Sequence, residues 1–73
     1  MTDDWEAKVR GGIKAELKRR NMTYQDLADK LCLLGVKDMP ENIANKISRG
    51  KFSAVFLVQC LSAIGCTVFR IEE

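Results

Sequence analysis

Apolar residues in the first part of the chain recur at every fourth position, on one side of a helical wheel: Trp5, Val9, Ile13 and Leu17. This spacing is typical of an amphipathic α-helix, and Asp3 with Glu6 can cap its start. We therefore expect a helix over about residues 3–20. Gly11 and Gly12 each weaken a helix by about 1 kcal/mol. We expect the helix to continue through them, with close packing on its backbone; a break at this pair is the alternative.

The second apolar stripe begins behind a strong capping signal. Thr23 and Asp26 have the three-residue spacing of a capping box. This spacing predicts a helix over about residues 23–34. Its buried stripe is expected to consist of Tyr24, Leu27, Ala28, Leu31 and Leu34.

A connector that contains "GVKDMP" leads into two further helical segments. Asp38 and Glu41 bracket its proline as a second capping box, because proline is tolerated in the first turn of a helix. We expect a helix over about residues 39–49. Ser53 can cap a fourth helix, over about residues 53–64, which is apolar on nearly all sides. A helix with this composition is expected to be central and buried.

The end of the chain has a different pattern. "TVFRI", residues 67–71, is β-branched and aromatic, which predicts a short strand. The length of 73 residues indicates one domain, and a hydrophobic content of 47% is ample for a core. We therefore expect a single all-α domain over residues 1–73, with four to five helices and a short C-terminal β-strand.

The composition argues against an enzyme. The chain has no histidine, and Cys32, Cys60 and Cys66 lack the spacing of a zinc site. Because the cysteines lie in apolar runs, we expect buried, reduced thiols. No nucleophile is spaced with a base, and no glycine-rich loop follows a strand, so we expect no catalysis, metal or cofactor. No run reaches the roughly 18 apolar residues of a membrane span, and no signal peptide is visible, which predicts a cytoplasmic protein that does not bind membranes.

Basic residues are concentrated in two regions, although the net charge is only +2. Residues 8–20 contain six bases and one acid, a charge of +5, and residues 42–71 contain four bases and no acid, a charge of +4. Two basic regions on one small domain favour a polyanionic partner. Two solvated helix faces are the alternative.

Two asparagines in the third helix, Asn42 and Asn45, are unexpected because asparagine is a poor helix former. At about 100° per residue, they share an arc with Lys46 and Arg49, opposite a core face of Ile43, Ala44 and Ile47. In the major groove, asparagine can read adenine and arginine can read guanine. These four polar residues are therefore candidate base contacts; a polar solvent face is the alternative.

Two stretches, "TYQDLADKL" and "NIANKISRGKFSAVFLVQCLSAIG", resemble helices two, three and four of the lambda-repressor-like (Cro/C1-type) helix-turn-helix domains. Leu27 and Ala28 match the apolar pair of that family, and "ISRG" matches the end of its recognition helix. The resemblance covers roughly residues 13–66, and the chain also resembles a small uncharacterised bacterial family of stand-alone domains of this type. It implies a DNA-binding transcriptional regulator whose helix 39–49 enters the major groove.

The resemblance also implies contacts with the DNA backbone. Members of the family often have glutamine at the second position of helix two; Tyr24 stands there in this chain, and its hydroxyl can hydrogen-bond a phosphate. The expected phosphate contacts are Tyr24, Gln25, Lys51, Lys14, Lys18 and Arg19. The turn between helices two and three is longer than in the family by about six residues, which leaves open whether the docking angle is kept.

Domains of this type usually bind DNA as two-fold dimers, and an unpaired strand is a liability in a monomer. We predict a homodimer in which residues 67–71 pair with their mate, with an interface of Val68, Phe69, Arg70 and Ile71. In the alternative, the segment folds back on its own domain and Phe69 lies beside Trp5. The alternative function is a protein–protein interaction module, or an antitoxin-type partner-binding domain, because "AIGCTVFRI" is similar to the tail of helix-turn-helix antitoxins.

Overall fold

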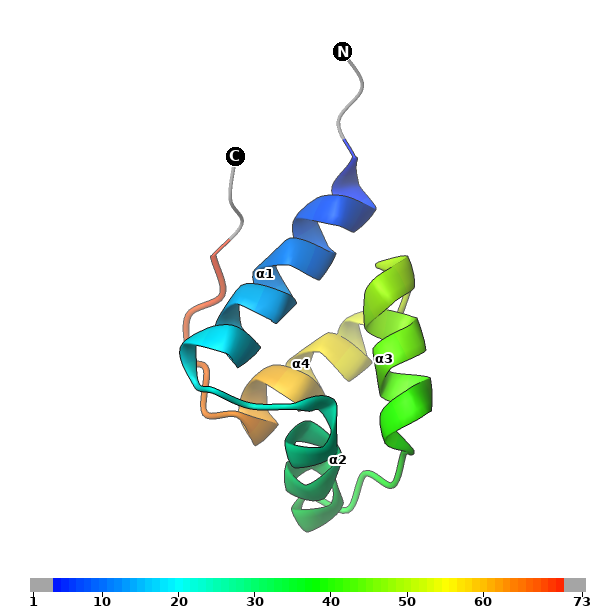
Figure 1. The fold of residues 1–73 in the computed structure, drawn as a ribbon, viewed down its shortest axis with the longest axis vertical. Coiled ribbons are helices and arrows are strands. Elements are labelled where there is room, and N and C mark those ends of the chain that lie inside the picture. The colour runs from blue at the N-terminus through cyan, green and yellow to red at the C-terminus, as the bar shows by residue number, and fades with distance from the viewer. Residues whose placement is uncertain (1–3, 71–73) are drawn as a thin grey trace.

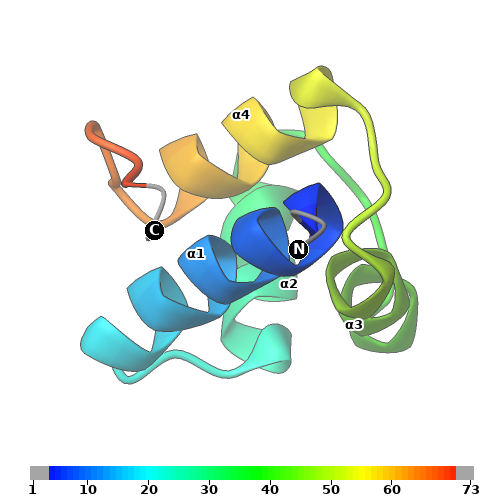
Figure 2. The same cartoon turned by 90° about the horizontal axis from the view of Figure 1, so that it is seen from above.

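The computed structural model describes residues 4–70, which form four α-helices. They are α1 (Trp5–Arg19), α2 (Tyr24–Leu33), α3 (Pro40–Arg49) and α4 (Ala54–Ala63). α1 extends toward one end of the molecule, while α2 and the connector to α3 lie at the other end (Figure 1). Viewed from above, α3 and α4 lie on different sides of α1 (Figure 2). The fold is all-α, as the sequence pattern predicts.

Side-chain caps determine where α2 and α4 begin. The Thr23 hydroxyl accepts a hydrogen bond from the Asp26 N–H at 3.1 Å, and the Asp26 carboxylate accepts one from the Thr23 N–H at 2.9 Å, which completes a capping box. The Ser53 hydroxyl accepts from the Phe56 N–H at 3.0 Å. These bonds satisfy backbone donors that have no partner within the helix.

The N-cap of α1 lies one residue later in the sequence than predicted. Asp4 is the N-cap, and its carboxylate accepts from the Ala7 N–H at 3.0 Å. Asp3, which the sequence pattern favoured for this role, lies outside the described residues. The helix is continuous through Gly11 and Gly12, as expected.

α3 begins without the predicted capping box. Its N-cap is Met39, which makes no side-chain cap, and Pro40 occupies the first turn. Asp38 stands one residue too early to cap the helix. Its carboxylate instead accepts from the Met39 N–H at 2.9 Å and from Lys46 Nζ at 2.7 Å. The prediction for Asp38 with Glu41 is therefore wrong, and Asp38 links the connector to the middle of α3.

The core lies where the helices face one another, with α2 packed against α3 and α4 and with α1 packed against α3. Its least exposed side chains are Ile13, Leu27, Leu31, Ile43, Ile47 and Cys60. α4 is not the buried central helix that its composition predicts. Only Phe56 and Cys60 are buried in it, whereas Val55 and Val58 are 66% and 60% exposed. A chain of this size has too little material to surround one helix on every side.

Residues 67–70 form no strand, so the predicted C-terminal β-strand is wrong for the part of it that the structure describes. A strand needs a second strand for its ladder of hydrogen bonds, and the described residues contain none. The segment instead packs along α1, where the Phe69 ring covers Gly12. A Cβ on Gly12 would lie 2.7 Å from Phe69 Cζ and 3.2 Å from the Arg70 carbonyl oxygen.

Candidate nucleic-acid interface

α3 turns an apolar side toward the core and a polar side toward solvent. Ile43 and Ile47 have no exposed surface, whereas Asn42, Asn45 and Arg49 are exposed. The three polar side chains therefore lie on the arc that the helical wheel predicts, opposite the core. Side-chain amides and guanidinium groups can each form two hydrogen bonds to one base edge.

Lys46 differs from its three neighbours on this arc. Its Nζ lies 2.7 Å from Asp38 Oδ2 and 4.7 Å from the centre of the Phe56 ring. The hydrogen bond from Lys46 lowers the pKa of the Asp38 carboxyl, against the opposing effect of burial. Lys46 therefore points toward the connector and α4, and its charge is balanced within the chain.

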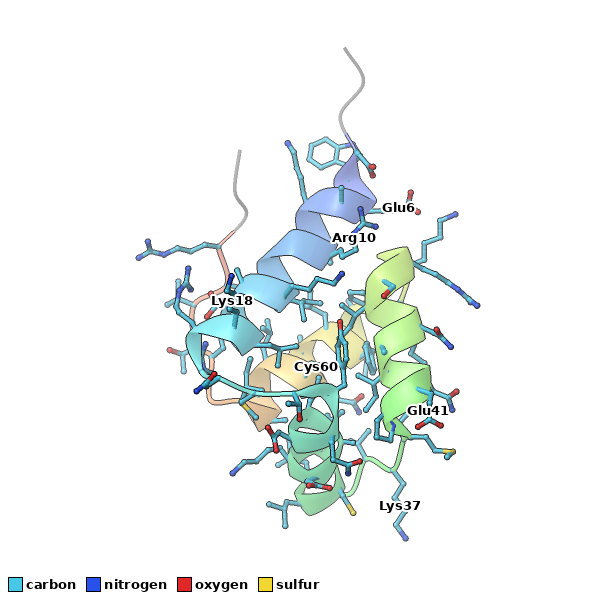
Figure 3. The ribbon with its side chains drawn as sticks, in the orientation of Figure 1. Glu6, Arg10, Lys18, Lys37, Glu41 and Cys60 are labelled. Carbon is cyan, nitrogen blue, oxygen red and sulfur yellow. The ribbon has the colours of Figure 1, made fainter. Side chains whose placement is uncertain are left out.

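The C-terminal end of α3 is held by the beginning of α1. Arg10 Nη1 donates to the Ser48 carbonyl oxygen at 3.0 Å. Gly50 follows in the left-handed conformation, with φ 66°, and any side chain there would collide with the backbone of Glu6. Lys51 Nζ lies 3.4 Å from the Glu6 carboxylate but is 76% exposed. Figure 3 shows Glu6 and Arg10 on α1, facing this end of α3. These contacts fix the position of α3 relative to α1.

A groove of about 420 Å³ lies between the C-terminal half of α1 and the start of α2. Lys14 and Lys18 are exposed on its rim, and Tyr24 lines it at the first turn of α2. Two ammonium groups and the positive end of a helix dipole both attract anions. Tyr24 is half-buried, and burial raises the pKa of its phenol. Its hydroxyl can donate a hydrogen bond. In Figure 2, the loop into α2 and α3 both lie in the lower half of the view, and α4 lies in the upper half.

Besides Lys51, two more of the predicted phosphate contacts, Arg19 and Gln25, have partners within the chain. Arg19 Nη1 lies 2.5 Å from Glu16 Oε2. Because Arg19 follows Lys18 directly, it lies about 100° further round α1, away from the groove. Gln25 Nε2 donates to Asp29 Oδ1 at 3.0 Å along α2. Both side chains are exposed, but neither lines the groove.

Glu16 is a buried acid that hydrophobic periodicity does not reveal. Its carboxylate binds Arg19 and Arg20 at 2.5 Å each, and these bonds, led by that from Arg20, lower its pKa. Arg20 Nε also donates to the Ile64 carbonyl oxygen at 3.0 Å, which ties the end of α4 to α1. A signal for this network exists in the sequence, because residues three and four positions apart lie on one face of a helix.

The residues predicted for a dimer interface have different environments. Val68 and Arg70 are exposed, whereas Phe69 is half-buried against α1. Ile71 lies outside the described residues. The segment folds back on its own domain, as in the alternative prediction, but Phe69 lies about two helical turns from Trp5 along α1. Trp5 is 66% exposed, with Lys8 Nζ 4.7 Å from its ring centre.

The three cysteines are free thiols. Cys60 and Cys66 are buried, but Cys32 is exposed, so the expectation of burial is wrong for Cys32. Cys32 follows the buried Leu31 directly and therefore lies on another side of α2. Burial raises the pKa of the Cys60 thiol to about 11. Among residues 4–70, no three His, Cys, Asp or Glu side chains are grouped so that they could hold a metal ion. No helix in the same range has the length and apolar character to cross a bilayer.

No curated protein and no solved structure matches the chain. A family model described as a domain of unknown function (DUF6471) matches residues 5–69. This range contains all four helices and ends at Phe69, whose ring packs against α1. The chain therefore belongs to the DUF6471 family, whose description assigns it no function.

Proposed function

We propose that this protein binds double-stranded DNA sequence-specifically, as a small transcriptional regulator, with α3 in the major groove. The observation that carries the proposal is the exposed arc of Asn42, Asn45 and Arg49 on a helix whose opposite side is buried. An α-helix fits the major groove, where amide and guanidinium groups find two-point partners on adenine and guanine. The resemblance of α2, α3 and α4 to Cro/C1-type domains supports the same use of α3.

Phosphate contacts are assigned to cations on either side of this arc. Lys14 and Lys18 border the groove beside the first turn of α2, where the Tyr24 hydroxyl is a further donor. Lys51 is 76% exposed just beyond the end of α3. Arg19 faces another side of α1, and Lys46 is paired with Asp38, so we assign neither of them a contact with DNA.

The long connector between α2 and α3 is anchored at two points. Val36 packs against the core, and the Asp38–Lys46 ion pair joins the connector to α3. α2 and α3 also pack directly on each other. This anchoring supports a fixed relation between the two helices, on which helix-turn-helix docking depends.

The proposal includes two chains on one two-fold DNA site, since a single small helix reads only a short half-site. The width of one molecule is consistent with this arrangement. Its two shorter extents are 21 Å and 20 Å, so two adjoining copies can place their α3 helices about 34 Å apart, one turn of B-DNA. Native mass spectrometry of the complex with a selected duplex measures the stoichiometry.

A protein–protein interaction module is the second candidate, and one observation favours it. α4 contains no charged residue, and Val55 and Val58 on it are 66% and 60% exposed. α4 and α3 lie on different sides of α1 (Figure 2), although Lys46 of α3 lies over the Phe56 ring of α4.

Selection of binding sites from a random duplex library tests the proposed function. We expect enrichment of one short motif, and mobility shifts on that motif that weaken steeply as the salt concentration rises. Asn45→Ala is expected to relax the preference at one base position of the motif and to leave weak binding to unrelated duplex nearly unchanged. Absence of enrichment together with salt-independent binding contradicts the proposal and favours the interaction module.

A further inference from the structure

A second basic cleft, of about 630 Å³, lies between the C-terminal half of α1 and the chain segment after α4. Arginines line it from both walls: Arg19 and Arg20 from α1, and Arg70 from the segment. The buried carboxylate of Glu16 is also part of the lining. Three guanidinium groups against one carboxylate leave the lining with a net charge of +2.

The three arginines are not equally available to a ligand. Arg20 is committed to the fold, because it binds the Glu16 carboxylate and the Ile64 carbonyl oxygen. Arg19 binds Glu16 through one nitrogen, but its side chain is 57% exposed. Arg70 is exposed and has no ion-pair partner among the described residues. Since a guanidinium group has five N–H donors, Arg19 and Arg70 can both bind an incoming anion.

The wall formed by residues 67–70 also offers main-chain groups. Within the described residues, the last backbone hydrogen bond is from the Cys66 N–H to the Leu61 carbonyl oxygen, at 2.8 Å. No backbone–backbone bond there involves residues 67–70. The wall is nevertheless held in place, because the Phe69 ring covers Gly12 on α1. The Val68 carbonyl oxygen accepts a hydrogen bond from Cys66 Sγ at 3.1 Å. Main-chain groups of this fixed segment that have no such bond can pair with an extended peptide, as a sheet edge does.

We propose that this cleft binds an extended acidic peptide segment of a partner protein. The peptide's carboxylates bind Arg19 and Arg70, for which guanidinium groups are well suited because they form paired, charge-assisted hydrogen bonds. Its main chain pairs with residues 67–70. A peptide is favoured over a small anion because the available arginines stand on opposite walls and the open main chain belongs to one of them.

Duplex DNA is not the proposed occupant of this cleft. The C-terminal segment and α3 lie on opposite sides of α1 in Figures 1 and 2. The arc of Asn42, Asn45 and Arg49 faces away from the core, on the α3 side. The cleft therefore stays accessible when α3 is in a major groove, and this inference does not depend on the proposed DNA binding.

Fluorescence anisotropy with a labelled octaglutamate peptide tests the proposal, with octaglutamine as the uncharged comparison. We expect the parent protein to bind octaglutamate at physiological salt, and Arg70→Gln to weaken binding by about fivefold or more, as expected for loss of a charge-assisted contact. Lys30→Gln is the matched control, because it removes the same charge from an exposed position of α2 that does not line the cleft. It should leave peptide affinity within about twofold, since salt screens charges at exposed positions outside the site.

Several results overturn the proposal. Equal losses in Arg70→Gln and Lys30→Gln mean that the peptide senses only net charge. Complete displacement by millimolar inorganic phosphate, with no gain of octaglutamate over free glutamate, identifies a small-anion site. If the peptide does not bind, and the protein sediments as a dimer that Arg70→Gln converts to a monomer, the cleft is a contact between copies. Peptide binding that depends on Arg70 in a protein with no DNA affinity supports the cleft while refuting the proposed function.

Discussion

Gly12 and Phe69 are in direct contact where the C-terminal segment meets α1. A Cβ on Gly12 would lie 2.7 Å from Phe69 Cζ, whereas a Cβ on the adjacent Gly11 would have no atom within 4 Å. The two neighbouring glycines therefore have different effects. Gly12 allows the segment to approach the helix backbone, and Gly11 only lowers the helix propensity of α1.

Replacing each glycine by alanine should separate these effects. Gly11→Ala is expected to stabilise the protein by about 1 kcal/mol, because alanine is the better helix former and the position is open. Gly12→Ala should be less stable than Gly11→Ala by about 1–3 kcal/mol, since the new methyl group displaces the Phe69 ring and crowds the Arg70 carbonyl oxygen. Urea unfolding of the two variants measures the difference, and equal stabilisation contradicts the contact.

The helices could be predicted from local signals, but their surroundings could not. Capping residues and apolar spacing act within a few residues, so Thr23 and Ser53 indicate where α2 and α4 begin. Whether residues 67–70 form a strand depends on which elements lie beside them. Their β-branched and aromatic composition fits a strand, but the described residues contain no second strand to pair with. The segment instead packs against α1 at Gly12.

Part of the candidate interface could likewise be predicted from the sequence, and part of it could not. The arc of Asn42, Asn45 and Arg49 follows from helix geometry alone, and the structure exposes these side chains. Lys46 belongs to the same arc by its position in the sequence, but its long side chain reaches Asp38 in the connector, eight residues away. By their positions in the sequence, Arg19 and Arg20 belong to the basic region of α1, but both bind the buried Glu16 carboxylate. Such pairs depend on side-chain reach and burial, which a helical wheel does not represent.

Asn45 provides the sharpest test of base reading. Asn45→Ala should lower the affinity for the selected duplex by about 1–3 kcal/mol, because a two-point contact with one base is lost. Binding to unrelated duplex should change little, since it depends on phosphates. Asn45 is exposed, so the variant is expected to fold normally. Fluorescence anisotropy on both duplexes gives the two affinities, and a matching loss on both contradicts a base contact.

The dependence of DNA affinity on salt should identify the phosphate contacts. The slope of log affinity against log salt concentration is negative, and each lost contact reduces its magnitude by about 1. We expect this change for Lys18→Gln, because Lys18 borders the groove beside the first turn of α2. Lys30→Gln removes the same charge from an exposed position of α2 that lines neither the groove nor the α3 arc. Its slope should match that of the parent; equal changes in both variants indicate a general charge effect.

Acid should weaken the attachment of α4 to α1 through Glu16. Hydrogen bonds from Arg20 and Arg19 lower the pKa of this carboxyl from its ordinary value of 4.5. Because the folded-state pKa is the lower one, the unfolded chain takes up the proton first as the pH falls. The stabilisation is therefore complete above about 4.5 and is lost as the pH falls through the folded-state pKa.

Glu16→Gln tests this contribution. The variant should be less stable than the parent at neutral pH, because Arg19 and Arg20 lose their carboxylate. It should also lose less stability than the parent on acidification. Some acid dependence should remain, because the pKa values of Asp26 and Asp38 are also lowered in the folded protein. Urea unfolding over a pH series measures both effects. Glu41→Gln serves as the control, since Glu41 is exposed on α3 and has no ion pair among the described residues. An acid dependence in Glu16→Gln as steep as that of the parent means that the network does not couple stability to pH.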